Sequence, residues 1–409
     1  MRANGVLRLA GWLILVMSLA LPLAAAAQTG EPQAEGSTPE VWLVTYGPGQ
    51  IYWQRFGHNA IWIRDPELGL DHTFNFGFFD FGQEDFFLRF LQGRMLYFSA
   101  AQPAREEFAS YIDEDRSIRA QKLEVGADRA LELAAYLLRE IQPQNRDYLY
   151  DYYVNNCSTR VRDAIDTALG GELRQRFGGV PAAQDWRDHT RRLSAGDFWL
   201  YLGLEIVLGA PVDQPITAWD EMFIPEKLAE AVQELHRPNA EGGTPLVSED
   251  VMLYESTRPL PPDRPHNWWP RYLLAALALL AAGALLARIG GRRVARALAR
   301  GWLAVAGIAG LAMLFFWFGT DHMAARDNIN VLLFNPLWLI PAAGRRTDKR
   351  VLLALAGIAL CAAPAEWLPL HQYNLDVLAA FLPLHFGAMA ALWPRAPVGP
   401  GRPGGEPGR

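Results

Sequence analysis

The chain has 409 residues, a formal net charge of −6 at pH 7 and a hydrophobic fraction of 51%. The net charge alone indicates little about function, because the charged residues are partitioned between different parts of the chain. We expect no nucleic acid among the partners of this protein. Two cysteines are present and the sequence shows no cluster of metal-binding residues, so we expect no metal and no other cofactor.

The N-terminus has the pattern of a secretory signal. Arg2 and Arg8 precede an apolar run over 9–23, and four alanines that end at Ala27 follow it. A positively charged start, a short apolar segment and a small-residue cleavage site define a signal peptide. We therefore predict a signal peptide over 1–27 that is cleaved after Ala27. The alternative is an uncleaved anchor helix.

Composition divides the rest of the chain into two parts. Residues 28–266 are rich in aromatic residues and hold most of the acidic groups, which is typical of a folded domain with its own core. Residues 267–394 contain apolar runs of near membrane-spanning length at 271–287, 302–318, 331–343, 351–367 and 375–393. We predict about five spans, of which the third is short, contains two prolines and is kinked or re-entrant. The tail over 395–409 is rich in Pro and Gly and is expected to be disordered.

Basic residues set the expected orientation of the spans. The segment between the first and second runs contains Arg288, Arg292, Arg293, Arg296 and Arg300. The segment between the third and fourth runs contains Arg345, Arg346, Lys349 and Arg350. Cytoplasmic loops of membrane proteins carry an excess of Lys and Arg. Placing both loops in the cytoplasm puts residues 28–266 outside it, in agreement with the signal peptide.

The first part reads as a mixture of strands and helices. Alternating or continuous apolar residues predict strands, and apolar residues at helical spacing predict helices. The predicted strands are 41–46, 58–64 and 71–79, the predicted helices are 127–142 and 157–169, and 148–154 is a short extended segment. The fold class predicted for the chain is therefore α+β, followed by an all-α transmembrane bundle.

Cys157 is the candidate nucleophile. The other cysteine, Cys361, lies in a predicted span, and a lone thiol in an oxidising compartment is a liability unless its reactivity is used. Asn155 or Asn156 is a suitable N-cap, which places Cys157 in the first helical turn, where the helix dipole lowers a thiol pKa. The alternative is a buried structural cysteine, which we would expect on the apolar face of the helix.

A thiol nucleophile needs a base, and His58 is the best placed histidine. The histidines of the first part are His58, His72, His189, His236 and His266. His58 opens a predicted strand, so its ring is free to project from the strand end into a cleft. The alternative is a structural histidine.

Asn75 is the candidate third member of the site. If the second and third strands form a hairpin that turns at 66–69, Ala60 lies opposite Asn75. Asn75 then shares a face with His58 and lies diagonally next to it. A single bulge would invert this arrangement and leave Asn75 as an edge residue among phenylalanines.

Several short motifs together resemble one family, the bacterial Lnb-type lipoprotein N-acyltransferases. They are Tyr46-Gly47-Pro48-Gly49, Phe56-Gly57-His58-Asn59-Ala60, Phe74-Asn75-Phe76-Gly77, Asn156-Cys157-Ser158-Thr159-Arg160 and Met222-Phe223-Ile224-Pro225. The resemblance covers about 40–230, and extends more weakly into the membrane part through Asn328, Asn330 and Asn335-Pro336.

This resemblance implies a permuted papain-like (NlpC-related) domain in the periplasm, attached to the bacterial inner membrane. The thiol of the family corresponds to Cys157 and its histidine to His58, while the third residue has no assignment. The implied reaction moves an acyl chain from a membrane phospholipid, through a Cys157 thioester, to the N-terminal diacylglyceryl-cysteine amine of lipoproteins. His58 takes the proton of Cys157 or rests with it as an ion pair.

The candidate substrate-binding residues are Asn156, Arg160 and Arg162. The two arginines either hold a lipid phosphate or are solvated helix charges. Two stretches dense in aromatic residues, 74–91 and 197–208, are either ordinary core or surfaces that contact the membrane and the acyl chain.

Two other functions fit the same residues. A papain-like cell-wall endopeptidase or amidase would use the same dyad with water as acceptor, although such a hydrolase needs no set of membrane spans. A non-catalytic membrane receptor or scaffold would keep its function after replacement of Cys157 by alanine.

Overall fold

The computed structural model describes residues 38–67, 69–237, 243–344, 348–364 and 371–394. The predicted signal peptide and the predicted disordered tail lie outside these ranges.

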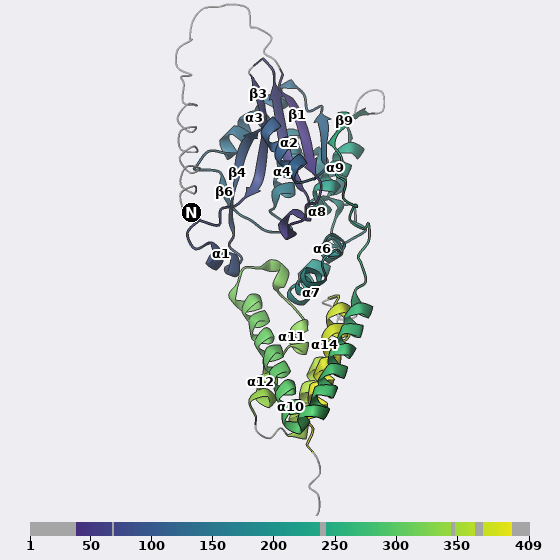
Figure 1. The fold of residues 1–409 in the computed structure, drawn as a ribbon. Helices are drawn as coiled ribbons and strands as arrows, with labels where there is room; N and C mark the ends of the chain where they lie inside the picture. Colours follow the sequence, from purple (N-terminus) through teal and green to yellow (C-terminus); the bar gives the residue numbers. More distant parts are fainter. Residues whose placement is uncertain (1–37, 68, 238–242, 345–347, 365–370, 395–409) are drawn as a thin grey trace, which may run out of the picture. The chain divides into compact units, whose positions relative to one another are not determined.

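Seven antiparallel strands form the main sheet, in the order β6-β4-β3-β2-β1-β5-β9 (Figure 1). The strands are β1 (Glu40–Tyr46), β2 (His58–Asp65), β3 (Leu70–Phe78), β4 (Leu96–Pro103), β5 (Ile118–Leu123), β6 (Asp147–Leu149) and β9 (Val247–Tyr254). Two short strands, β7 (His236–Arg237) and β8 (Thr244–Pro245), form a separate ladder. The antiparallel sheet with helices confirms the predicted α+β class for this part of the chain.

Nine α-helices accompany the sheet in the described residues before 268. They are α1 (Phe86–Gln92), α2 (Ala104–Asp113), α3 (Ala127–Glu140), α4 (Cys157–Ala168), α5 (Glu172–Phe177), α6 (Trp186–Ser194), α7 (Phe198–Val207), α8 (Ala218–Glu221) and α9 (Pro225–Glu234). Short 3-10 turns are η2 (Tyr52–Gln54) and η3 (Ala210–Asp213).

Helices α4 and α2 cover opposite faces of the sheet. Leu43 and Ile61 belong to the core that contains the apolar face of α4. Val44 and Ala60, their neighbours in sequence, pack instead with Tyr111 of α2. Successive side chains of a strand point to opposite faces, so the central strands β1 and β2 are buried on both sides. This double burial explains the unbroken apolar runs at 41–44 in β1 and 60–63 in β2.

The membrane part begins with α10 (Trp269–Gly319), a 51-residue helix that is broken at Gly291, where φ is 67°. Figure 1 shows the two arms of α10 on either side of this break. The first two predicted spans fall one in each arm. The break lies in the basic segment between them, where glycine tolerates a positive φ.

The remaining membrane segments are shorter. They are η4 (Met323–Ala325), α11 (Asn330–Leu333), η5 (Pro336–Trp338), α12 (Leu339–Ala343), α13 (Lys349–Leu360) and α14 (Leu375–Leu392). The third predicted span is thus divided into α11, η5 and α12. Among the described residues, α10 and α14 are the helices long and apolar enough to cross a membrane.

One predicted element is only partly correct. The extended segment expected over 148–154 forms a strand only as β6 and then turns. The Asp151 side chain accepts the backbone N–H groups of Tyr153 and Val154 at 2.9 and 3.0 Å. Such an Asx turn replaces the ladder hydrogen bonds of a strand, so the chain reverses just before α4.

Candidate active site

Cys157 is the first residue of α4, as predicted, and Asn156 is the N-cap. The Asn156 side chain accepts the Thr159 N–H at 2.9 Å, and the Thr159 hydroxyl accepts the Asn156 N–H at 2.8 Å. This capping box satisfies amide groups that the first helical turn leaves free. The side-chain Nδ2 of Asn156 also donates to the backbone carbonyl of Phe223 at 2.9 Å. The backbone next to Cys157 is therefore fixed by hydrogen bonds within α4 and by one to Phe223.

A side-chain hydrogen bond joins the start of α4 to the beginning of β2. The Ser158 hydroxyl lies 2.8 Å from the Asn59 side-chain oxygen and 2.6 Å from the Met222 carbonyl, and these two acceptors share its single proton. The backbone N–H groups of Asn59 and Ser158 interact with the Cys157 sulfur and lower its pKa. Since Asn59 directly follows His58, the hydrogen bond between Ser158 and Asn59 holds Cys157 near the strand end that carries the histidine.

Gly77 provides the space for Cys157 at the end of β3. It has a φ of 101°, and a Cβ at this position would lie 3.3 Å from the Cβ of Cys157. Any side chain there would strain the backbone and crowd Cys157. The motif Phe74-Asn75-Phe76-Gly77 therefore combines a polar side chain with a required glycine.

His58 and Asn75 form the pair that the strand register predicts. Ala60 lies opposite Asn75, as expected, and the His58 Nε2 lies 2.8 Å from the Asn75 Oδ1. Asn75 is buried, and its Nδ2 donates to the Glu107 carboxylate at 2.6 Å. The Glu107 carboxylate also accepts hydroxyl hydrogen bonds from Thr73 and Tyr46.

The Glu107 carboxylate fixes the proton position on His58. Because a carboxylate accepts and an amide nitrogen donates, the Nδ2 of Asn75 must face Glu107 and its Oδ1 must face His58. The Oδ1 accepts, so the Nε2 of neutral His58 carries the proton. The Nδ1 of His58 is then left with a free lone pair, which is the form that a general base requires.

The pKa expected for the thiol is wrong in direction. Burial raises the pKa of Cys157 to about 11, and the hydrogen bonds from Asn59 and Ser158 only partly oppose this. Burial also lowers the pKa of His58 to about 4. The cost of removing a charge from water exceeds the stabilisation by the helix start. At these pKa values both groups are neutral near pH 7, which is contrary to a resting thiolate–imidazolium ion pair.

Cys157, His58 and Asn75 line one cavity of about 870 Å³. Its volume lies within the usual range for small-molecule sites. Most of its remaining wall is aromatic or aliphatic, with residues from β3, α7 and the end of α10. The three sequence-predicted catalytic residues therefore face a common and mainly apolar space.

Only one of the three candidate substrate-binding residues lines the cavity in the described part of the chain. Among the described residues that line the cavity, Asn156 is present and the two arginines are not. Arg160 pairs with Glu140 at 2.9 Å, and Arg162 donates to the carbonyl of Trp219 at 2.9 Å. Because their guanidinium groups are held elsewhere, the structure gives no support to a lipid-phosphate role for Arg160 or Arg162.

Arg116 is a cavity residue that sequence reasoning missed. Its side chain is 5% exposed, its Nε donates to the Gly47 carbonyl at 2.9 Å, and its guanidinium lies over the Tyr111 ring. One terminal nitrogen has no hydrogen-bond partner among the described residues. Its positive charge lowers the pKa of Cys157 and of His58. Nothing in the local sequence marks this arginine, since only the fold brings it to the cavity.

Glu107 was also missed, although α2 carries a signal for it. Ala104 and Glu107 are the buried residues of this amphipathic helix, and Phe108 and Tyr111 pack on the sheet. A carboxylate is unusual on the apolar face of an amphipathic helix. Its presence there indicates that the carboxylate has a buried hydrogen-bonding partner.

Comparisons with known proteins give the family. The model of the Lnb N-terminal periplasmic domain matches residues 29–192, and that of the Lnb transmembrane domain matches residues 264–393. No curated protein and no solved structure matches the chain. The chain belongs to the Lnb family, with a periplasmic N-terminal domain followed by a transmembrane domain.

Proposed function

We propose that this protein is a thiol-dependent lipoprotein N-acyltransferase of the bacterial inner membrane. It transfers a fatty acyl chain from a phospholipid to the N-terminal diacylglyceryl-cysteine amine of lipoproteins. The observation that carries the proposal is that Cys157 and the His58–Asn75 pair line the same mainly apolar cavity. Membership of the Lnb family supports the same reaction.

The first half-reaction forms a thioester on Cys157. The Nδ1 of His58 takes the thiol proton while the sulfur attacks the ester carbonyl of the phospholipid, forming a carbon–sulfur bond. The carbon–oxygen bond of the ester then breaks. The proton on His58 passes to the departing oxygen, and a lysophospholipid leaves.

The second half-reaction forms the amide. The neutral α-amine of the diacylglyceryl-cysteine attacks the thioester carbonyl, forming a carbon–nitrogen bond, and His58 takes a proton from the nitrogen. The carbon–sulfur bond breaks, and the proton returns to the Cys157 sulfur. The site is then back in its neutral resting form.

Backbone amides supply the electrostatic support for both steps. The N–H groups of Asn59 and Ser158 interact with the Cys157 sulfur, so they lie near the carbon that the sulfur attacks. Preorganised backbone donors at such a position stabilise the oxyanion of a tetrahedral intermediate. We assign these two groups to the oxyanion site.

The order of the functional residues supports a permuted papain-like arrangement. His58 and Asn75 come from neighbouring antiparallel strands and precede Cys157, which starts a helix packed on β2 and β3. We propose this fold for residues 28–266, and a membrane domain of about five spans for residues 267–394.

A cell-wall endopeptidase or amidase is the second candidate. Its substrate is a polar peptide, which needs many hydrogen-bonding partners, whereas most of the cavity wall is apolar. An apolar wall also limits the access of water, which favours transfer to an amine over hydrolysis.

A depletion strain tests the proposed function against this candidate and against a scaffold role. We expect wild-type protein to restore N-acylated lipoprotein N-termini, and Cys157→Ala and His58→Ala to fail at equal abundance. Mass spectrometry of the lipoprotein N-termini measures this. Equal N-acylation by Cys157→Ala would refute the transferase, and so would cleaved wall peptides without N-acylation.

A further inference from the structure

Helix α7 presents a continuous stripe to the cavity beside Cys157. Leu200, Gly203, Leu204 and Val207 all line it, at the spacing that places residues on one helix face. The buried Tyr201 lies off this stripe, in a core with the start of α10. The cavity-facing stripe spans roughly 10 Å along the helix, given a rise of about 1.5 Å per residue.

The membrane part completes the cavity wall. Phe316 of α10 and Ala324 of η4 line it together with Phe90 of α1. His322, just before η4, hydrogen-bonds to the Phe90 carbonyl at 2.8 Å. On the other side, the side chain of Asn328 donates to the Val207 carbonyl at 2.9 Å. The wall is therefore held together by hydrogen bonds between the two parts of the chain.

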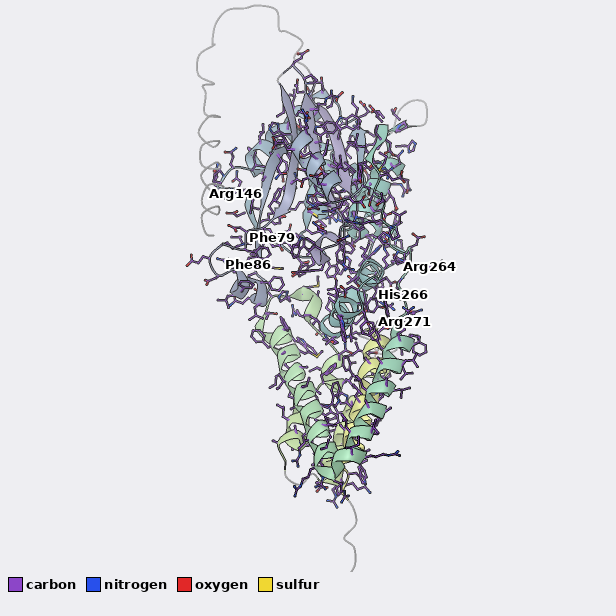
Figure 2. All side chains as sticks on the ribbon, in the orientation of Figure 1. Phe79, Phe86, Arg146, Arg264, His266 and Arg271 are labelled. Carbon is purple, nitrogen blue, oxygen red and sulfur yellow. The ribbon has the colours of Figure 1, made fainter. Side chains whose placement is uncertain are left out.

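The aromatic residues near α1 extend this apolar surface. Phe79 lines the cavity, and its ring stacks on that of Phe86 with 6.3 Å between centroids (Figure 2). Phe81 packs edge-on against both rings. The cavity residues that α1 and α7 contribute are all apolar or glycine, whereas polar cavity residues such as His58 and Arg116 belong to other parts of the chain.

We propose that the α7 side of this cavity is the binding site for the acyl chain carried on Cys157. The inference rests on the proposed function and adds the location of the chain and the residue that limits its length. A long apolar chain fits this wall because it needs no hydrogen-bonding partners, and burial of its methylene groups stabilises the bound form.

Gly203 sets the space available to the chain. It lies in the middle of the stripe, and a Cβ at this position would meet no atom within 4 Å. A larger side chain is therefore accommodated by the helix and projects from the stripe into the space of the acyl chain. Gly301 of α10 has the same open surroundings but does not line the cavity among the described residues, so it is the matched control.

The first test measures chain-length preference. Full-length protein is placed in liposomes with equal amounts of decanoyl and palmitoyl phosphatidylethanolamine, and the acylated lipopeptide is analysed by mass spectrometry. We expect Gly203→Phe to lower the palmitoyl-to-decanoyl product ratio by about tenfold, as expected when roughly two methylene groups lose their buried contacts. Gly301→Phe should leave the ratio unchanged. An unchanged ratio in Gly203→Phe, with wild type active, would overturn the proposed acyl site.

A second test needs no acyl transfer, so it separates failure of the acyl site from failure of the proposed function. In a Cys361→Ala background, Cys157 is the sole thiol of the chain. It is labelled with N-ethylmaleimide and with N-dodecylmaleimide, and the two rates are compared. We expect Gly203→Phe, or Gly203→Val if the larger variant does not fold, to reduce the dodecyl-to-ethyl rate ratio several-fold relative to wild type. Equal ratios in wild type and variant would refute the site, whether or not the protein transfers acyl groups.

Discussion

At the residue scale, a thiol and a histidine–asparagine pair line the same cavity. Cys157, His58 and Asn75 were predicted from export, helix capping and strand register, and the structure brings all three to one cavity. The predicted direction of the thiol pKa was wrong because desolvation depends on tertiary packing. Arg116 and Glu107 were missed for a related reason, since their partners are distant in sequence.

The pKa values lead to a testable pH dependence. Because the pKa of Cys157 is raised to about 11, the thiolate fraction should increase about tenfold per pH unit from neutral pH towards that value. We expect alkylation of Cys157 in a Cys361→Ala background to show no plateau below about pH 10. Iodoacetamide labelling at a series of pH values measures this. A plateau at neutral pH would show that Cys157 and His58 rest as an ion pair.

Asn75 should act on the rate rather than on substrate binding. Without it, His58 loses the hydrogen bond that fixes its ring and its proton position. We expect Asn75→Ala to lower kcat by about 100-fold with little change in KM, within the range for loss of acid–base function. Asn155→Ala is the control, because that asparagine hydrogen-bonds to the Leu149 carbonyl outside the site. Equal effects of both substitutions would contradict the role of Asn75.

Arg116 should support the thiolate. Its charge lowers the pKa of Cys157, so we expect Arg116→Gln to slow alkylation of Cys157 about three- to tenfold at pH 8. Arg160→Gln should leave the rate unchanged, since Arg160 is paired with Glu140. A larger effect of Arg160→Gln than of Arg116→Gln would contradict the role of Arg116.

At the element scale, α1 differs from the surface of an ordinary soluble protein because it exposes large apolar side chains. It is a short helix with the sequence FFLRFLQ, and Phe87 is 77% exposed. The loop that follows α10 is hydrogen-bonded to it, with the Asp321 N–H donating to the Gln92 carbonyl at 2.8 Å. An exposed aromatic helix beside the end of a membrane helix is typical of a segment that lies in the bilayer interface.

Replacing Phe87 should therefore weaken lipid use without unfolding the protein. We expect Phe87→Ser to lower acylation with liposome donors by about tenfold, while the melting temperature changes little because the side chain is exposed. Leu131→Ser on α3, also at an exposed apolar side chain, is the matched control. Equal activity of Phe87→Ser and Leu131→Ser would contradict contact between α1 and the membrane.

At the scale of the whole molecule, a buried ion pair and a buried hydrogen bond join the two parts of the chain. Arg191 of α6 lies 3.6 Å from Asp376 of α14, and Tyr201 of α7 donates to the same carboxylate at 3.1 Å. Together with the hydrogen bonds around His322 and Asn328, these contacts fix the membrane segments that line the cavity. Hydropathy predicted the apolar runs, but the break of α10 at Gly291 and the division of the third run appear only in the fold.

The orientation of the spans remains a prediction that reporter fusions test. We expect fusions at Arg293 and Arg346 to report the cytoplasm, and fusions at His322 and Gln372 to report the periplasm. The contact of His322 with Phe90 places His322 beside the periplasmic domain, and Gln372 contacts Leu208 at the C-terminal end of α7. A cytoplasmic signal at His322 would contradict the five-span arrangement.

The central claim is that Cys157 carries the acyl chain, and intact-protein mass spectrometry tests it most directly. The full-length Cys361→Ala protein is incubated with phospholipid liposomes without acceptor, and a diacylglyceryl lipopeptide is then added. We expect a mass increase of one acyl chain on Cys157 that hydroxylamine removes and that the lipopeptide converts into N-acylated product. Formation of the N-acylated product at an equal rate by the Cys157→Ala protein would contradict the account.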